Sequence, residues 1–229
     1  YDQVYIDSFS DSLTKIYQFD KKANELIEEA KTFFNKVLSL SEIDIENPKN
    51  FSVNLSDFEK EDIWTPRFSN PKFVNTEIIL KERFKNISLG HIADFQKGDE
   101  PGSDSYIEYK DSKETDIPFI RTTDIVNHEC DMFPDFYIPY EYSNELKQDI
   151  QKGDILFTKD GKIGETAILT ENDLVFLSSG ILRIRISDNN QQLFGLTPEY
   201  VFTCLSTKET GYFPAIRRTI VGTTIPHLR

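Results

Sequence analysis

The chain has 229 residues, 38% of them hydrophobic and 13% aromatic, and its formal net charge is −13. This apolar content suffices for a folded core and excludes wholesale disorder. The negative charge argues against a general nucleic-acid binder, because such proteins are usually basic. The charge is uneven, however: residues 1–64 hold 14 Asp and Glu against 7 Lys, whereas residues 201–229 hold four Lys and Arg against one Glu. The sequence is therefore compatible with an acidic protein that carries local basic surfaces.

The sequence has no feature of a membrane or secreted protein. It has no run of 18 apolar residues, as a transmembrane helix would need. Its first residues, YDQVYIDSFSDS, lack the basic and apolar regions of a signal peptide. We expect a cytoplasmic protein without membrane contact. Cys130 and Cys204 have no paired spacing, so we interpret them as reduced core thiols rather than a disulfide or a zinc site.

Residues 11–40 are predicted to form one long helix, capped by Ser10 or Asp11. Its apolar residues recur at alternating three- and four-residue steps, the spacing of a coiled-coil seam, once Asp20 is accepted as an interruption. Leu26, Phe33 and Leu40 widen this stripe. A wide stripe needs neighbours, which its own domain or a partner helix would supply equally well. The seam residues are Leu13, Ile16, Ala23, Ile27, Ala30, Phe34 and Val37.

Residues 41–75 are predicted to be a connector, because three prolines punctuate them. A short helical turn is expected within 55–64 and a helix over 75–84, capped by Asn75 or Thr76. Short strands follow, over 87–95, 117–121, 133–139, 174–177 and 181–186. Helices are expected over 144–150 and 198–205, the second with Pro198 in its first turn. A final turn is expected at 222–224.

The segment KGDILFTKDGKIGETAIL, residues 152–169, is predicted to be a β-hairpin. Ile155 to Phe157 form a short apolar strand, Asp160-Gly161 is typical of a two-residue turn, and a second strand runs over 163–169. The tip carries Lys159 and Lys162 with little side-chain bulk, so it suits close approach to a phosphate backbone. A solvated turn, with lysines for solubility only, is the competing interpretation.

The sequence contains no recognisable catalytic or metal-binding motif. The stretch GKIGET, residues 161–166, lacks the GxxxxGK[ST] spacing of a phosphate-binding loop. His91, His128 and His227 lie far apart without metal-ligand spacing. No GxSxG, HExxH or CxxC occurs. We therefore predict no catalytic residue and no metal site in this chain.

Six motifs in order carry a resemblance: LGHIADFQKGDEPG (89–102), IPFIRTTDI (117–125), the 152–169 hairpin, SSGILRIRI (178–186), TPEYVFTCL (197–205) and VGTTIPHL (221–228). Together they resemble the target-recognition domain of type I restriction–modification specificity (S) subunits, over roughly residues 85–229. The helix with ANELIEEAKTFF is similar to the helical spacer of that family. The fold implied is α+β, a mixed, twisted β-sheet recognition domain with a long N-terminal coiled-coil-type helix. The implied bounds are 1–45 for the spacer, 46–84 for a connector and 85–229 for the recognition domain.

The resemblance implies a non-catalytic protein that reads one part of a split sequence in double-stranded DNA. Its implied partners are adenine-methylating (M) subunits and a restriction (R) subunit, with a homodimer through the long helix as a further option. S-adenosylmethionine, Mg and ATP would be used by those partners, and the target base would be flipped by the methylase. The chain itself would need no cofactor.

Candidate DNA contacts come from chemistry within these motifs. Phosphate contacts need Lys, Arg, Ser, Thr or backbone N–H groups, and base contacts need side chains that enter a groove. Competing interpretations are an Arg121–Asp124 ion pair, turn chemistry for the serines, and a solvated helix end for the paired arginines. The candidates are Lys97, Arg121, Thr122, Thr123, Lys159, Lys162, Ser178, Ser179, Arg217, Arg218 and Thr223.

The sequence departs from a usual S subunit in holding one recognition domain. Three expectations stay open: a half-length subunit that dimerises, a fragment of a two-domain subunit, and the recognition end of a fused methylase–nuclease. The start without Met, and an end where the family pattern would continue into a second helix, favour a fragment. A rival from another class is a protein-interaction module that uses the long helix and the acidic surface, with no role on DNA.

Overall fold

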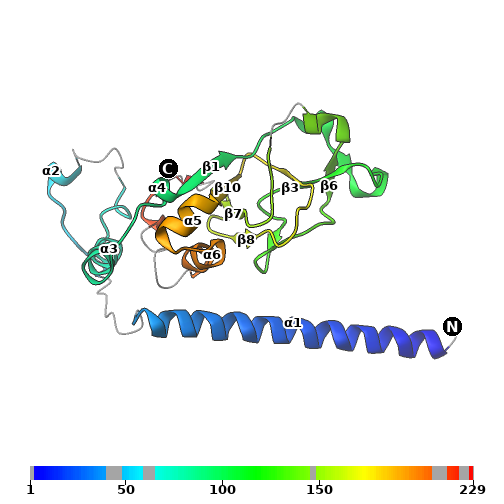
Figure 1. Cartoon of the computed structure of the whole chain (residues 1–229), viewed down its shortest axis with the longest axis horizontal. Helices are drawn as coiled ribbons and strands as arrows, with labels where there is room; N and C mark the ends of the chain where they lie inside the picture. The colour runs from blue at the N-terminus through cyan, green and yellow to red at the C-terminus, as the bar shows by residue number, and fades with distance from the viewer. Residues whose placement is uncertain are drawn as a thin grey trace. The chain divides into compact units, whose positions relative to one another are not determined.

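The computed structural model describes residues 3–39, 48–58, 65–144, 148–207, 216–221 and 227–228. Contacts divide the chain into two compact units, Tyr1–Asp44 and Ile45–Arg229, each described here by itself. The first is a long helix and the second combines antiparallel and mixed sheets with short helices (Figure 1). The predicted α+β class with a long N-terminal helix is therefore confirmed. No described helix has the length and apolar character needed to cross a membrane.

Helix α1 spans Gln3–Val37, so it begins eight residues before the predicted start. The predicted cap at Ser10 or Asp11 is wrong, because both residues lie inside the helix. Polar side chains fit inside this helix because their hydroxyl groups can hydrogen-bond to its backbone. Ser12 and Thr14 each donate to the carbonyl oxygen four residues back, at 2.9 Å. Leu40, expected to extend the stripe, lies outside the described residues.

The longer helix extends the apolar seam by one heptad. Ile6 and Phe9 continue the three–four spacing backwards from Leu13. Their exposed fractions are 49% and 66%. Of the predicted seam residues, Leu13, Ile16, Ala23, Ala30 and Val37 are exposed, Ile27 is half-buried and Phe34 is buried. A seam of nine apolar residues interrupted only by Asp20, and largely open to water, is unusual for a stable surface.

The expected connector contains two helices, α2 (Leu55–Phe58) and α3 (Pro71–Arg83). The predicted start of the second helix at 75 is wrong. Asn70 caps α3, its Oδ1 accepting the N–H of Lys72 at 2.9 Å, and Pro71 takes the first turn, where its missing N–H costs nothing. The Asn-Pro pair, interpreted from sequence as a break, is thus a helix start. Residues 59–64 of the expected turn at 55–64 lie outside the described residues.

The first sheet has the order β1-β10-β7-β8 and is antiparallel throughout (Figure 1). Its strands are β1 (Ala93–Lys97), β7 (Ile155–Thr158), β8 (Thr166–Ile168) and β10 (Ile181–Ile186). The short helix α4 (Leu89–Ile92) replaces the first half of the strand predicted over 87–95. Helix α6 (Pro198–Ser206) confirms the helix predicted over 198–205, and its Val201 and Leu205 pack against Phe157 and Ile184 of the sheet. Helix α5 (Asp188–Phe194), capped by Ser187 and ended by Gly195 at φ 65°, was not predicted.

The second sheet has the order β2-β6-β3-β9. Its strands are β2 (Ile107–Glu108), β3 (Ile117–Ile120), β6 (Phe136–Ile138) and β9 (Phe176–Leu177). β3 and β9 are parallel and the other pairs antiparallel. Phe119 packs between Tyr106, at 4.9 Å between ring centroids, and Phe176, at 5.7 Å. Because β9 lies at an edge, its outer backbone groups need partners from elsewhere.

Two-stranded pairs and single turns complete the second unit. β4 (Ile125–Val126) pairs with β5 (Glu129–Cys130), and β11 (Ile220–Val221) with β12 (His227–Leu228). The 3-10 turns are η2 (Ser103–Ser105), η3 (Tyr109–Asp111) and η4 (Tyr140–Asn144). The helix predicted over 144–150 is wrong where the structure describes it, because Asn144 ends the 3-10 turn η4 and 148–150 have no regular structure. The turn predicted at 222–224 lies outside the described residues.

Candidate nucleic-acid interface

Four chain segments that are distant in sequence meet around Gly180, and we call them the loop junction: 97–100, 121–124, 159–165 and 177–180. A Cβ at Gly180 would lie 2.7 Å from Cγ2 of Thr122 and 3.8 Å from Cβ of Asp160. The carbonyl of Gly180 accepts the N–H of Lys159 at 2.9 Å. A side chain at this position would collide with Thr122, so the close approach requires glycine.

A second glycine allows the remaining segment to join. A Cβ at Gly98 would lie 2.2 Å from the carbonyl oxygen of Ser178 and 2.4 Å from that of Leu177, both backbone atoms. Asp99 and Ser178 form an isolated parallel bridge, and the Asp99 N–H donates to Leu177 O at 2.9 Å. The end of β1 is therefore held directly against the turn after β9.

The hairpin tip differs from the prediction. β7 and β8 pair antiparallel as expected, but a seven-residue loop, 159–165, joins them instead of a two-residue turn, and β8 begins at Thr166 rather than at 163. Thr158, fully buried, organises this loop. Its hydroxyl donates to Lys162 O and accepts the N–H of Glu165 at 2.9 Å, and its carbonyl accepts the N–H of Gly164 at 2.9 Å. These bonds close the wider loop, which spacing alone did not reveal.

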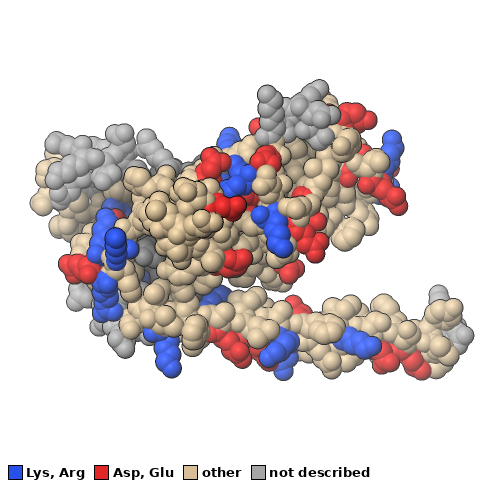
Figure 2. All heavy atoms as spheres, viewed as in Figure 1, with Lys and Arg blue, Asp and Glu red and all other residues tan. Residues whose placement is uncertain are grey.

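The two lysines of the hairpin tip have acidic partners. Lys159 Nζ lies 2.5 Å from Asp160 Oδ2, and Lys162 Nζ lies 3.7 Å from Glu165 Oε1. The Lys162 side chain is 64% exposed, against 21% for Lys159, so Lys162 is the freer of the two to meet a phosphate. On the face in Figure 2, described Lys and Arg side chains likewise stand interspersed with Asp and Glu.

Arg121 forms the ion pair that its competing interpretation proposed. Its Nε lies 3.2 Å from Asp124 Oδ2, and its Nη2 lies 3.0 Å from Asp135 Oδ2. The guanidinium also lies over the ring of Phe136, 4.6 Å from its centroid. Asp124, which is buried, accepts the Arg121 N–H and the Thr123 hydroxyl as well. These contacts hold the 121–124 turn rigid, and a role for Arg121 on DNA stays a prediction.

Most of the remaining candidates lie at the loop junction, but Arg217 and Arg218 do not. Lys97 is exposed beside Gly98, Ser178 is buried, and Ser179 donates to Glu100 Oε2 at 3.3 Å. The structure thus brings eight candidates onto the junction segments and places two elsewhere, with Thr223 outside the described residues. The eight are Lys97, Arg121, Thr122, Thr123, Lys159, Lys162, Ser178 and Ser179.

Arg218 instead ties the C-terminal segment to α3. Its Nη1 lies 2.6 Å from Glu77 Oε2, its Nε donates to Phe68 O at 3.1 Å, and its guanidinium lies 4.1 Å from the Phe68 ring centroid. A hydrogen bond from Lys81 and the charge of Arg218 lower the pKa of Glu77, against the opposing effect of burial. Arg217, its neighbour, is exposed.

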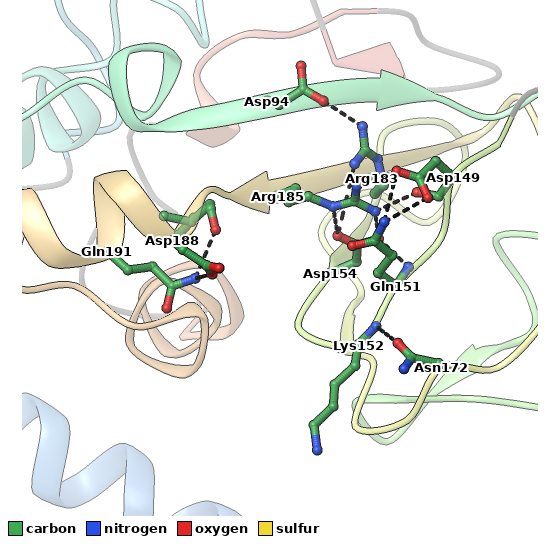
Figure 3. A network of polar contacts seen from close by, with 11 residues as sticks. Asp94, Asp149, Gln151, Lys152, Asp154, Asn172, Arg183, Arg185, Asp188 and Gln191 are labelled. Atoms are coloured by element: carbon green, nitrogen blue, oxygen red, sulfur yellow. Dashed lines mark hydrogen bonds and ion pairs between the residues drawn. The ribbon is translucent and has the colours of Figure 1, made fainter.

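A network of arginines and aspartates, not anticipated from sequence, lies beside the first sheet (Figure 3). Arg185 of β10 donates to the Asp154 carboxylate through Nε, to Oδ1 at 2.6 Å, and through Nη2, to Oδ2 at 2.7 Å. Its Nη1 donates to Asp149 Oδ2 at 2.7 Å. Arg183 reaches Asp94 of β1 at 2.6 Å. Hydrogen bonds from Arg185 and from Gln151 lower the pKa of Asp149. The sequence ILRIRI could have indicated this network, because Arg183 and Arg185 are two residues apart on one strand and therefore share a face of the sheet.

Cys204 is buried, as expected of a core thiol, whereas Cys130 is half-buried. Both cysteines are free. Burial raises the pKa of Cys130 to about 12 and that of Cys204 to about 11, so both stay protonated at neutral pH and are poor nucleophiles. Within the described ranges, no three His, Cys, Asp or Glu side chains gather as metal ligands would.

Comparisons with known proteins point to one family. The family model described as type I restriction modification DNA specificity domain matches residues 81–229, more than half of the chain. Among solved structures, the HsdS subunit from Thermoanaerobacter tengcongensis is similar at 12% identity and a TM-score of 0.45, over 93% of this chain and 42% of that one. The type I restriction–modification S subunit from M. genitalium is similar at 14% identity and a TM-score of 0.41, over 62% and 30%.

A third similar structure concerns complex assembly and conformational transition of the type I R-M system, at 15% identity and a TM-score of 0.38, over 94% of this chain and 46% of that one. The chain spans less than half the length of each of these three proteins. No curated protein matches the sequence.

Proposed function

Because the chain belongs to the family of type I restriction–modification DNA specificity domains, we propose that its second unit binds double-stranded DNA and reads one part of a bipartite target. The loop junction is the observation that carries this proposal. Four segments from the ends of different strands converge there, each with short polar side chains or exposed lysines. A rigid frame that presents hydroxyls, backbone groups and a few cations suits contact with base edges and phosphates.

The proposed partners follow from the same premise. M subunits would supply adenine methylation with S-adenosylmethionine, and an R subunit, with Mg and ATP, would supply cleavage. Helix α1 would pair with a second helix, from another copy of the chain or from elsewhere in a longer protein, and hold two recognition units apart. The seam from Ile6 to Val37, most of whose side chains are exposed, supports a helical partner from either of these sources.

Selection from a randomised duplex library tests the proposal. The chain, alone and with its methylase subunits, is incubated with the library at two salt concentrations, and bound DNA is sequenced. We expect a defined half-site to be enriched in the complex and weaker, salt-sensitive binding by the chain alone. If neither sample enriches a sequence nor binds DNA, while α1 still associates with a protein, the rival reading as a protein-interaction module is correct.

We predict that the hairpin tip contacts phosphates rather than bases. Lys159→Ala with Lys162→Ala should weaken binding to all sequences about equally and should lower the log–log salt slope by up to about 1.8, since each phosphate contact contributes about 0.9. Most of the effect should come from Lys162, whose side chain is the more exposed. Binding isotherms at several salt concentrations measure both quantities.

The matched control is Lys81→Ala on α3, because its side chain is also 64% exposed and ion-paired. It should leave the salt slope unchanged. An unchanged affinity of the double variant in the methylase complex would remove the hairpin tip from the DNA contacts.

We also predict that the chain alone transfers no methyl group, cleaves no DNA and hydrolyses no ATP. The reason is chemical: the sequence has none of the motifs that these reactions use. Incubation with labelled S-adenosylmethionine and the selected duplex measures the first activity. Incorporation of label by the purified chain without M subunits would favour the alternative of a fused methylase.

A further inference from the structure

The outer edge of β9 is completed by a side chain, that of Gln148, beside the single backbone hydrogen bond that it receives from Asp99 at the end of β1. On its inner side, the Ser178 N–H donates to Ile120 O of β3 at 2.9 Å. On its outer side, the backbone N–H of Leu177 donates to Gln148 Oε1 at 2.7 Å, and Leu177 O accepts from Gln148 Nε2 at 2.9 Å. One carboxamide thus bonds both the N–H and the C=O that Leu177 turns away from β3.

The same carboxamide reaches the end of β1. Gln148 Nε2 donates its second hydrogen to Asp99 Oδ2 at 3.0 Å. Asp99 adjoins Glu100, the acceptor for Ser179, and Leu177 adjoins the 178–180 turn. Gln148 therefore joins two of the four segments of the loop junction at their bases. Both its donor hydrogens are used there, so little of the amide remains for a ligand.

Gln148 is itself held from the opposite side. Its neighbour Asp149 accepts from Arg185 of β10 through the carboxylate, at 2.7 Å, and through the backbone carbonyl, at 2.5 Å. Arg185 is fixed in turn by Asp154, whose side chain is fully buried. A continuous path of hydrogen bonds therefore runs from the first sheet, through 148–149, to the edge of the second sheet and the junction (Figure 3 shows its first part).

We propose that Gln148 is a positioning residue for sequence discrimination: together with the direct backbone hydrogen bond from Asp99 to Leu177, it fixes how the 97–100 and 177–180 segments lie against each other, without contacting DNA. This inference rests on the proposed function. Base recognition depends on hydrogen-bond geometry, which a small displacement of either segment would degrade. Phosphate contacts carry no sequence information and tolerate such a displacement. Loss of Gln148 should therefore reduce discrimination between sequences more than total affinity.

The test compares Gln148→Leu with Gln151→Leu, the same substitution three residues along the same loop. The Gln151 side chain is exposed and, among the described residues, donates to the Asp149 carboxylate. The full chain, in complex with methylase subunits, first yields its preferred duplex by library selection. Dissociation constants are then measured for that duplex and its single-base-pair variants over a range of salt. We expect Gln148→Leu to lower the discrimination ratio at least tenfold at one or more positions, with an unchanged salt slope. Gln151→Leu should behave as wild type.

A second pair keeps the inference testable if Gln148→Leu does not fold. Gln148→Glu places a carboxylate against Asp99 and removes both donors, and adding Asp99→Asn restores one donor and removes the repulsion. We expect discrimination to be lower in Gln148→Glu than in the double variant. Equal ratios in these two, or a folded Gln148→Leu with the wild-type ratio, would overturn the inference alone. A wild-type complex that selects no sequence would overturn the proposed function, and this inference with it.

Discussion

Replacement of Asp154 with alanine is expected to lower the free energy of unfolding by about 3–5 kcal/mol, the usual cost of breaking a buried ion pair from one side. The Asp154 side chain is fully buried and accepts from Arg185 at two points and from the N–H of Gln151 at 2.8 Å. Arg183, only 5% exposed, lies 4.0 Å away, and two of its guanidinium nitrogens have no hydrogen-bond partner in the part of the chain that the structure describes. Removal of this carboxylate would leave two guanidinium groups short of negative charge.

Urea unfolding of the second unit, followed by tryptophan fluorescence or circular dichroism, measures the loss as a change in midpoint at constant slope. The control is Asp149→Ala, because the Asp149 side chain bonds the same Arg185 but is 66% exposed. It should cost at most about 1 kcal/mol. The double variant Asp154→Leu with Arg185→Met should be more stable than Asp154→Ala, since it removes the charge that is left unpaired. An Asp154→Ala variant as stable as the control would show that the network is not structural.

Insertion of four residues after Ala30 is expected to lengthen the spacer of the methylated bipartite site by about two base pairs, leaving the bases of each half-site unchanged. The 35-residue α1 is about 52 Å long at 1.5 Å per residue, more than the roughly 34 Å of one turn of B-DNA. Four further residues add about 6 Å. If α1 spaces two recognition units, that distance must appear in the DNA. Sequencing of methylated positions after expression with the M subunits measures it.

Ile27→Glu tests whether the seam itself does the pairing. The substitution puts a charge in the seam without lowering helix propensity, so it should abolish pairing and with it recognition of the bipartite site. Gln18→Glu introduces the same residue on α1 outside the seam and should leave recognition intact. An insertion that leaves the spacer length unchanged, or alters the bases read, would exclude α1 as the spacing element.

The elements predicted well from sequence are those with strong local signals. β10 and α6 were located within a residue because ILRIRI is apolar and β-branched and because Pro198 marks a helix start. Predicted element boundaries were wrong where one short sequence is compatible with two local structures. Asn70-Pro71 is equally suited to a break and to a capped helix start, and Asp160-Gly161 to a two-residue turn and to part of the loop that Thr158 organises.

The site could be predicted only as a set of residue types, because its geometry depends on contacts between distant segments. Gln148 lies 49 residues from Asp99 and 29 from Leu177, and nothing in its local sequence distinguishes it from an ordinary exposed glutamine. The same reason explains Arg218: its neighbours in sequence suggested a basic surface, but Glu77 and Phe68, 141 and 150 residues away, hold it. The local sequence around a charged residue cannot indicate whether a distant residue of opposite charge forms an ion pair with it.

Because the seam of α1 is largely exposed, the stability of this helix should depend on the concentration of its partner. A helix that leaves its apolar stripe in water gains little from tertiary packing, and helices draw most of their stability from such packing. Association with a partner would stabilise it by an amount that grows with the logarithm of partner concentration. The second unit, with its own core, does not share this dependence. Supply of the partner would therefore control whether α1 is formed, while the second unit remains folded throughout.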